Sequence, residues 1–201
     1  MLQLIIRILV KVLYNPKVYF EDDATGTRRI GGPAIIVSNH TSHLDGPILN
    51  STLRGPQIRT LAAKDRFSQF GFGFFLRHTG CIPIDRQKAD TSWIHESLKI
   101  LRNNGIIAIY PEGRHGTHRH QLPFHSGVSM LAVMARVPIV MVYIDGPHRA
   151  FHRTGMIIGK PFTIDVPASG LTSDYVEAQT RILEEKMRNL MHKYIENQQI
   201  I

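Results

Sequence analysis

The sequence predicts an α/β protein with a mostly parallel central sheet flanked by helices. Short apolar runs alternate with helix-like segments along most of the 201 residues, which is typical of strands joined by crossover helices. Several of these runs end directly in polar or charged residues, as strands often do at the carboxyl edge of a parallel sheet. The length fits one domain, and 43% hydrophobic with 20% charged residues argues against disorder.

The first element is an amphipathic helix over residues 1–15. Gln3, Arg7, Lys11 and Tyr14 are spaced by four, four and three residues, so they form one polar stripe on an otherwise apolar helix. The apolar run is too short and too charged to cross a bilayer, which takes about 20 apolar residues. We therefore expect a helix in the membrane interface, with its basic residues toward the headgroups. The alternative is a helix packed on the protein's own core.

Six later runs, each four to eight residues long and rich in Ile and Val, are expected to form strands. They cover residues 34–38, 58–62, 81–84, 106–110, 139–144 and 157–164. Helical segments are expected between them, near residues 47–53, 66–77, 90–103 and 126–136. A closing helix over about 173–197 carries an apolar stripe at helical spacing, which we expect to pack against the core.

The net charge of +8 and the pI of about 9.9 predict a surface that attracts anions. Nucleic acid, anionic lipid, phosphorylated metabolites and acidic proteins all fit this charge. No nucleic-acid module is recognisable and most aromatic residues fall within apolar runs, so we expect no nucleic-acid partner. The single cysteine, Cys81, excludes an intrachain disulfide framework and is compatible with a reducing compartment.

The most informative segment is Asn39–Asp45, which directly follows the first apolar run after the N-terminal helix. A neutral imidazole such as that of His40 can take a proton from a hydroxyl near pH 7, and the Asp45 carboxylate can orient it. Along a regular helix the two side chains would point about 140° apart, so a turn is needed to bring them together. The alternative is an Asn/Ser/Asp-rich cap on the next helix.

Two further runs end in residues able to bind an anion. Arg86 follows the run at 81–84, where it could bind a phosphate or pair with Asp85. Glu112, Gly113 and Arg114 follow the run at 106–110, and the glycine permits close approach of a ligand to the backbone. Because strand ends on one edge of a parallel sheet share a crevice, these segments are expected to form one site.

Together these segments resemble the glycerolipid acyltransferase family, of the 1-acylglycerol-3-phosphate acyltransferase type. The family's blocks N-H-x-S-x-x-D, G-apolar-R, F-P-E-G-T-R-S and V-P-I-V-P occur here in order and with agreeing spacing over about 39–142. The first block is matched in full, the third in part, and the fourth except at its last proline, where this chain has Met141. The matching residues are Asn39, His40, Ser42, Asp45, Gly80, Ile84, Arg86, Tyr110, Pro111, Glu112, Gly113, Val137, Pro138, Ile139 and Val140.

The resemblance implies an acyltransferase domain over residues 16–201. It would transfer a fatty acyl group from a thioester, acyl-CoA or acyl carrier protein, to the free hydroxyl of lysophosphatidate in phospholipid synthesis. His40 would be the general base and Asp45 would orient it, with no metal and no cofactor besides the thioester co-substrate. Because both lipid substrates are largely insoluble, we expect a peripheral enzyme on the cytoplasmic face of a membrane, with the phospholipid surface as a partner.

The resemblance also implies that Arg86, Glu112 and Gly113 bind the acceptor head group, and Lys64 is a further candidate phosphate contact or an isolated surface lysine. This chain has Arg114-His115-Gly116 where the family has Thr-Arg-Ser. We expect Arg114 to take over the phosphate contact. An acyltransferase for a different lysolipid or hydroxyl acceptor is the alternative that this departure leaves open.

A metal-dependent hydrolase is a second alternative, because histidines are dense in two places. One group is His40 and His43 with Asp45, and the other comprises His115, His118, His120 and His125. No H-E-x-x-H motif occurs, and the second group lies in a segment with the composition of a solvated basic loop.

Overall fold

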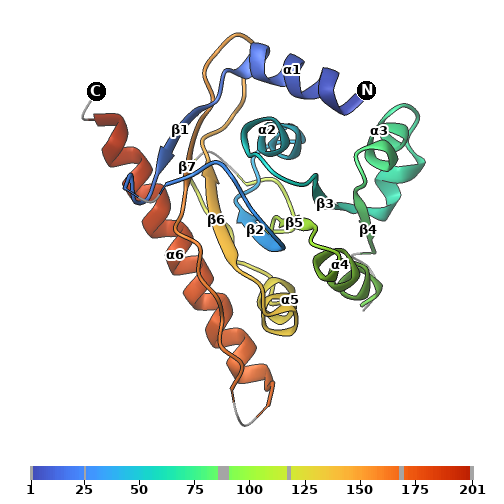
Figure 1. Ribbon diagram of the computed structural model, residues 1–201, viewed down its shortest axis with the longest axis vertical. Helices are drawn as coiled ribbons and strands as arrows, with labels where there is room; N and C mark the ends of the chain where they lie inside the picture. Colours follow the sequence, from blue (N-terminus) through green and yellow to red (C-terminus); the bar gives the residue numbers. More distant parts are fainter. Residues whose placement is uncertain (1, 25, 86–90, 117–118, 168–169, 200–201) are drawn as a thin grey trace.

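The computed structural model describes residues 2–24, 26–85, 91–116, 119–167 and 170–199. Its centre is a seven-stranded sheet in the order β1-β7-β6-β2-β5-β3-β4 (Figure 1). The strands are β1 Lys17–Phe20, β2 Ala34–Ser38, β3 Ile58–Ala63, β4 Ile82–Ile84, β5 Ile106–Ile109, β6 Ile139–Ile144 and β7 Gly155–Ile158. All neighbouring pairs are parallel except β6 and β7, so the predicted mostly parallel α/β sheet is confirmed.

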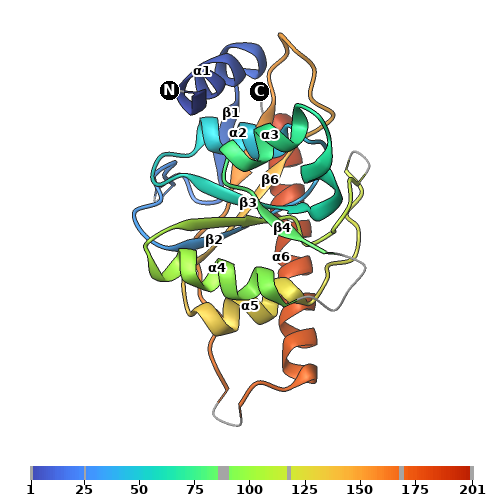
Figure 2. The ribbon, with the colours of Figure 1, turned by 90° about the vertical axis from the view of Figure 1, so that its right-hand side faces the viewer.

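Helices cover both faces of the sheet (Figures 1 and 2). They are α1 Leu2–Tyr14, α2 Asp45–Thr52, α3 Phe72–His78, α4 Ser92–Arg102, α5 Gly127–Ala135 and α6 Ser173–Gln199, with a 3-10 helix, η1 Lys64–Ser68. The central strands are buried on both faces, which explains why they read as continuous apolar runs rather than alternating ones. In β2, Ile35 and Val37 belong to the core under α4, α5 and α6, whereas Ile36 belongs to the core under α1 and α2.

Three details differ from the sequence-based prediction. Strand β1 was not predicted, because it is a four-residue edge strand, half-buried throughout, that pairs only with β7. The helix expected at 66–77 is two helices, η1 and α3, separated at Gly71, whose φ is 72°. The strand expected at 157–164 is the shorter β7, and Phe162 forms only an isolated bridge with Ile139.

The N-terminal helix, Leu2–Tyr14, lies within the predicted range 1–15 and combines features of both interpretations. One face packs on the domain, where Val10 and Tyr14 are buried and the Arg7 guanidinium donates to the Leu53 carbonyl at 3.0 Å. The other face is apolar and exposed, with Leu4, Ile5, Ile8, Leu9 and Val12 at least 55% accessible. The expectation that Arg7 points outward was therefore wrong. Within the described part of the chain, no helix is long and apolar enough to cross a membrane.

Candidate active site

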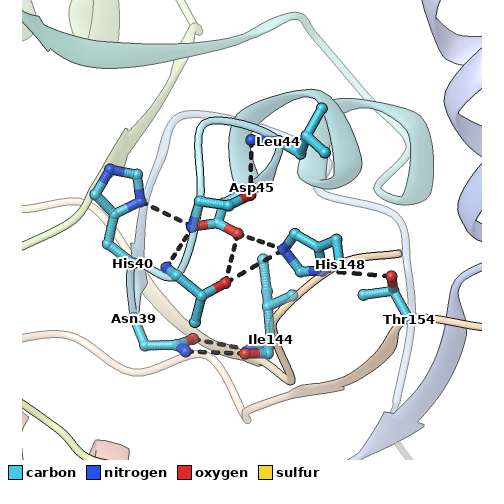
Figure 3. Close-up of polar contacts among 9 residues, drawn as sticks. Asn39, His40, Leu44, Asp45, Ile144, His148 and Thr154 are labelled. Carbon is cyan, nitrogen blue, oxygen red and sulfur yellow. Dashed lines mark hydrogen bonds and ion pairs between the residues drawn. The ribbon is translucent and has the colours of Figure 1, made fainter. Parts of the chain in front are cut away.

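The first site element is the turn that follows β2. The Asn39 side chain bonds the backbone of Ile144 in both directions, at 2.8 and 2.9 Å, which ties the end of β2 to β6. The chain then turns and enters α2 at Asp45, which brings His40 Nδ1 to 2.8 Å from Asp45 Oδ2 (Figure 3). The N-cap residue, Leu44, makes no side-chain cap bond. The turn required by the spacing is present, and the carboxylate faces His40 instead of capping the helix.

Asp45 is fully enclosed and accepts five hydrogen bonds. Oδ2 accepts from His40 Nδ1 and from the backbone N–H groups of Thr41 and Ser42, and Oδ1 accepts from the Thr41 hydroxyl and from His148 Nε2. Burial by itself raises the pKa of Asp45. Hydrogen bonds from His148, His40 and the Ser42 backbone outweigh it and hold that pKa well below its usual range. The group is a carboxylate at neutral pH.

An ionised carboxylate only accepts hydrogen bonds, so the contact with Asp45 places the proton of neutral His40 on Nδ1. Nε2 is then the unprotonated nitrogen that can accept a proton. The imidazole stacks on the Tyr110 ring, with centroids 4.2 Å apart and planes 15° from parallel. Position, tautomer and ring plane of His40 are therefore all defined, which is what a general base requires.

His40 lies in the wall of a cavity of about 420 Å³. Helices α1, α2 and α3 and strand β3 surround it, and Leu61, Phe72 and Phe75 are among its apolar lining residues. Its cationic lining side chains, among the residues described, are Arg7, Arg66 and Arg114. A cavity that combines apolar lining with a histidine and a few cations suits an amphiphilic, anionic ligand.

A family model described as Acyltransferase matches residues 16–145, more than half of the sequence. The chain belongs to this acyltransferase family. It is 26% identical over 164 residues to 1-acyl-sn-glycerol-3-phosphate acyltransferase of Bacillus subtilis (strain 168), covering 79% of this chain and 81% of that protein. It is 33% identical over 166 residues to 1-acyl-sn-glycerol-3-phosphate acyltransferase beta of Homo sapiens, covering 78% and 59%. The predicted enzyme class, an O-acyltransferase, is confirmed.

Two further proteins are similar to this chain. N-acylphosphatidylethanolamine synthase of Arabidopsis thaliana is 27% identical over 173 residues, covering 70% of this acyltransferase and 60% of that protein. The crystal structure of the 1-acyl-sn-glycerophosphate (LPA) acyltransferase PlsC from Thermotoga maritima superposes with a TM-score of 0.65, covering 98% of this chain and 79% of that one. At 19% identity, this structural likeness establishes a common fold.

The acyltransferase brings only some of the predicted site residues to the cavity. His40 and Arg114 line it, whereas Lys64 is exposed at the start of η1 and is not among its described lining residues. Arg66, two residues further along η1, lines it instead. Arg86, like His118, lies outside the residues that the structure describes, so its phosphate contact stays a prediction.

Glu112 and Gly113 are not among the described lining residues of the main cavity either. The Glu112 carboxyl is only 4% exposed, and it accepts hydrogen bonds from the backbone of Leu122 and of His40. Burial has the larger effect on the pKa of Glu112 and raises it to about 7, although those hydrogen bonds act to lower it. Gly116 N–H also donates to the His40 carbonyl at 2.7 Å. These contacts support the His40 backbone, and head-group binding by Glu112 and Gly113 stays a prediction.

Two other histidines of the acyltransferase, His43 and His115, lie beside His40. The His115 ring meets those of His40 and His43 edge-on, with centroids 4.2 and 4.4 Å away. Burial, helped by His40 and His43, lowers the pKa of His115 to about 4, and burial likewise lowers that of His43. His115 is therefore neutral at pH 7, although it stands where the family has an arginine. Over the residues described, no three His, Cys, Asp or Glu side chains are grouped to hold a metal.

The sequence-based prediction missed His148 and Arg66. His148 lies in the loop 145–154 that joins β6 to β7, and its Nε2 is 2.6 Å from Asp45 Oδ1 (Figure 3). Its signal was present: the loop follows a predicted strand, so it begins at the same edge of the sheet as Asn39–Asp45. Arg66 had no comparable signal, because its approach to the cavity depends on the 3-10 turn of η1.

Proposed function

We propose that this acyltransferase transfers a fatty acyl group from a thioester donor to the free hydroxyl of lysophosphatidate in phospholipid synthesis. The observation that carries the proposal is His40, whose Nδ1 lies 2.8 Å from Asp45 Oδ2, in the wall of a partly apolar cavity. The names of the Bacillus subtilis and Homo sapiens relatives support lysophosphatidate as the acceptor. The proposed donor is acyl-CoA or acyl carrier protein, as the family resemblance implies.

In the proposed mechanism, His40 Nε2 takes the proton of the acceptor hydroxyl as its oxygen attacks the thioester carbonyl. The carbonyl electrons move onto oxygen, and the C–S bond breaks when the tetrahedral intermediate collapses to the ester. The imidazolium returns its proton to the departing thiolate, so one ester and one thiol are formed. Asp45, ionised throughout, stabilises the imidazolium, as in the Ser-His-Asp triad with the substrate hydroxyl in place of serine.

A direct test is a thioester-release assay with both donors across lysophosphatidate, glycerol 3-phosphate and several lysolipids. We expect thiol release that depends on lysophosphatidate and that matches ester formation one for one. Release independent of any acceptor would identify a thioesterase and contradict acyl transfer. Release with glycerol 3-phosphate alone would contradict the proposed acceptor.

An acyltransferase for another lysolipid or hydroxyl acceptor is the second candidate. The observation that favours it is His115, which is neutral at pH 7 where the family has a permanently charged arginine. The cationic side chains of the described lining that remain for phosphate recognition are Arg7, Arg66 and Arg114, and none of them occupies the position of that arginine. The acceptor series in the same assay separates the two candidates.

We predict that Arg114→Ala raises the KM for lysophosphatidate roughly 10- to 100-fold while kcat changes little, because the variant loses a charge-assisted hydrogen bond made equally in ground and transition states. Arg119→Ala is the matched control, since Arg119 belongs to the same loop but pairs with Asp145 at 3.7 Å. Initial-rate kinetics on both variants check the prediction. An unchanged KM for Arg114→Ala would show that another side chain binds the phosphate.

We also propose that the enzyme is peripheral on the cytoplasmic face of a membrane, held partly by α1. The helix exposes a continuous apolar face, and Lys11 beside it can attract anionic headgroups, at about 1 kcal/mol per basic residue near such a surface. Phe70 and Phe74 are exposed residues of the η1–α3 segment. This segment lies in the same half of the molecule as α1 (Figures 1 and 2). Both α1 and α3 border the cavity, so a lipid could pass between them from the bilayer.

Replacing Leu4, Ile8 and Val12 together by glutamine is expected to weaken binding to anionic vesicles at least about tenfold, because three side chains lose apolar burial in the interface. Turnover of detergent-dispersed substrate should stay within about twofold, since the inward face of α1 is unchanged. The matched control replaces Val166, Leu171 and Ile182, which are exposed apolar residues outside α1. Vesicle flotation provides the measurement, and unchanged flotation of the α1 variant would contradict this role.

A further inference from the structure

A second histidine contacts Asp45 on the side away from His40. The side chain of His148 is fully enclosed, at 0% exposed, and its Nε2 lies 2.6 Å from Asp45 Oδ1 (Figure 3). This contact joins residues 103 positions apart in the sequence. It belongs to none of the four sequence blocks that carry the family resemblance.

The direction of this hydrogen bond follows from the charge of Asp45. The carboxylate can only accept, so His148 Nε2 carries a proton and donates it. On the other side of the ring, Nδ1 lies 3.4 Å from the Thr154 hydroxyl, which can donate to it. Both nitrogens of His148 therefore meet a partner, and the contact with Asp45 requires a proton on Nε2.

The loop that carries His148 is itself tightly held. Its backbone N–H groups at Phe151 and Thr154 donate to the last carbonyls of α1, at 2.6 and 2.8 Å. Gly146 packs so closely on Thr41 that an added Cβ would lie 2.4 Å from the Thr41 hydroxyl oxygen. The ring edge of Tyr14 packs against His148, with centroids 6.4 Å apart. These contacts hold His148 in place beside Asp45, so His148 needs no rearrangement to donate its hydrogen bond.

We propose that His148 is a positioning residue for catalysis, acting through Asp45. Its hydrogen bond, with that of the Thr41 hydroxyl at 3.0 Å, engages Oδ1 and keeps Oδ2 aligned on His40 Nδ1. Without it, the carboxylate can rotate about its Cβ–Cγ bond and the support of the His40 imidazolium weakens. The inference rests on the proposed roles of His40 and Asp45.

A matched pair of variants tests it. His148→Gln keeps an N–H donor near the position of Nε2, whereas His148→Leu has similar bulk and no donor. We expect His148→Leu to lower kcat roughly 10- to 100-fold with little change in KM, because the lost bond supports the base and not the substrate. His148→Gln is expected to stay within about fivefold of wild type. Equal losses in the two variants, or a loss confined to KM, would overturn the inference.

The second measurement tests whether the effect of His148→Leu on kcat depends on Asp45. In an Asp45→Asn background there is no carboxylate to position, so adding His148→Leu is expected to change the residual kcat by less than about twofold. A full multiplicative loss would assign His148 a structural role independent of Asp45 and overturn the inference. If Asp45→Asn itself leaves kcat unchanged, the proposed catalytic pair fails, which is a separate result.

A third measurement does not depend on the folding of His148→Leu. In wild-type enzyme with 15N-labelled histidine, the His148 signals can be assigned by their loss in His148→Gln. We expect Nε2 to carry a proton at neutral pH. An unprotonated Nε2 would contradict donation to Asp45 and overturn the inference.

Discussion

Replacing His40 with alanine is expected to lower kcat for acyl transfer by at least roughly 1,000-fold, with a small effect on the KM for either substrate. In the proposed mechanism the His40 imidazole accepts the hydroxyl proton, and Asp45, which only holds it, cannot take over that role. Tyr110, stacked on it, is a poor substitute base because burial raises its pKa well above 10. Steady-state kinetics with a radiolabelled acyl donor would measure the residual rate.

The matched control for this loss is His43→Ala. His43 lines the same cavity and contacts the same His115 ring, but it has no described hydrogen bond to Asp45. We expect its kcat to stay within about tenfold of wild type, which separates the base from general disturbance of the histidine cluster. If the two variants lost activity equally, or if His40→Ala stayed active, the assignment of His40 as base would be wrong.

The sequence could predict the pairing of His40 with Asp45 because the two residues are five positions apart and share one turn. The residues that complete the site are remote in sequence and meet through the order of the strands. His148 reaches Asp45 only because β6 lies beside β2, and no spacing within the chain encodes that neighbour relation. Prediction from residue patterns therefore captured the local contact between His40 and Asp45 and missed its long-range support.

A similar limit applies to the fold. The central strands were predictable because burial on both faces requires apolar residues at every position. The edge strand β1, with the sequence Lys-Val-Tyr-Phe, has no such requirement and forms through pairing with β7. For α1, the polar stripe predicted the helix correctly but not which residues face inward, because Arg7 finds a buried acceptor at Leu53. Helix orientation depended on a partner that the spacing of polar residues cannot reveal.

Asp45→Asn is the substitution with the second largest expected effect, a fall in kcat of roughly 1,000-fold. The asparagine amide group would have to replace one acceptor oxygen, yet every contact of both carboxylate oxygens is with a donor. A buried N–H₂ would then face another N–H or O–H, and His40 could adopt the wrong tautomer. Each donor left without an acceptor costs about 1–3 kcal/mol, so a lowered melting temperature should accompany the loss.

The control for Asp45→Asn is Asp174→Asn, an exposed aspartate in the first turn of α6, which is expected to keep kcat and nearly the same stability. Calorimetry and kinetics on the two purified variants would separate local from general effects. An Asp45→Asn enzyme with wild-type kcat would show that His40 needs no carboxylate.

The pH dependence of the stability that is lost in Asp45→Asn tests whether Asp45 acts as a fixed negative charge. A carboxyl group whose pKa is lowered in the folded state stabilises the fold above its unfolded pKa, and this contribution is lost as pH falls through the lower folded pKa. Asp45 is therefore ionised throughout the neutral range, and the unfolding free energy lost on Asp45→Asn should not shrink between pH 9 and about pH 4, and should shrink only below that. A loss of unfolding free energy that already shrinks between about pH 9 and 6 would mean that Asp45 takes up a proton there. The hydrogen bonds from His148, His40 and the Ser42 backbone would then not hold it ionised, and orientation of the base by a fixed negative charge would have to be abandoned.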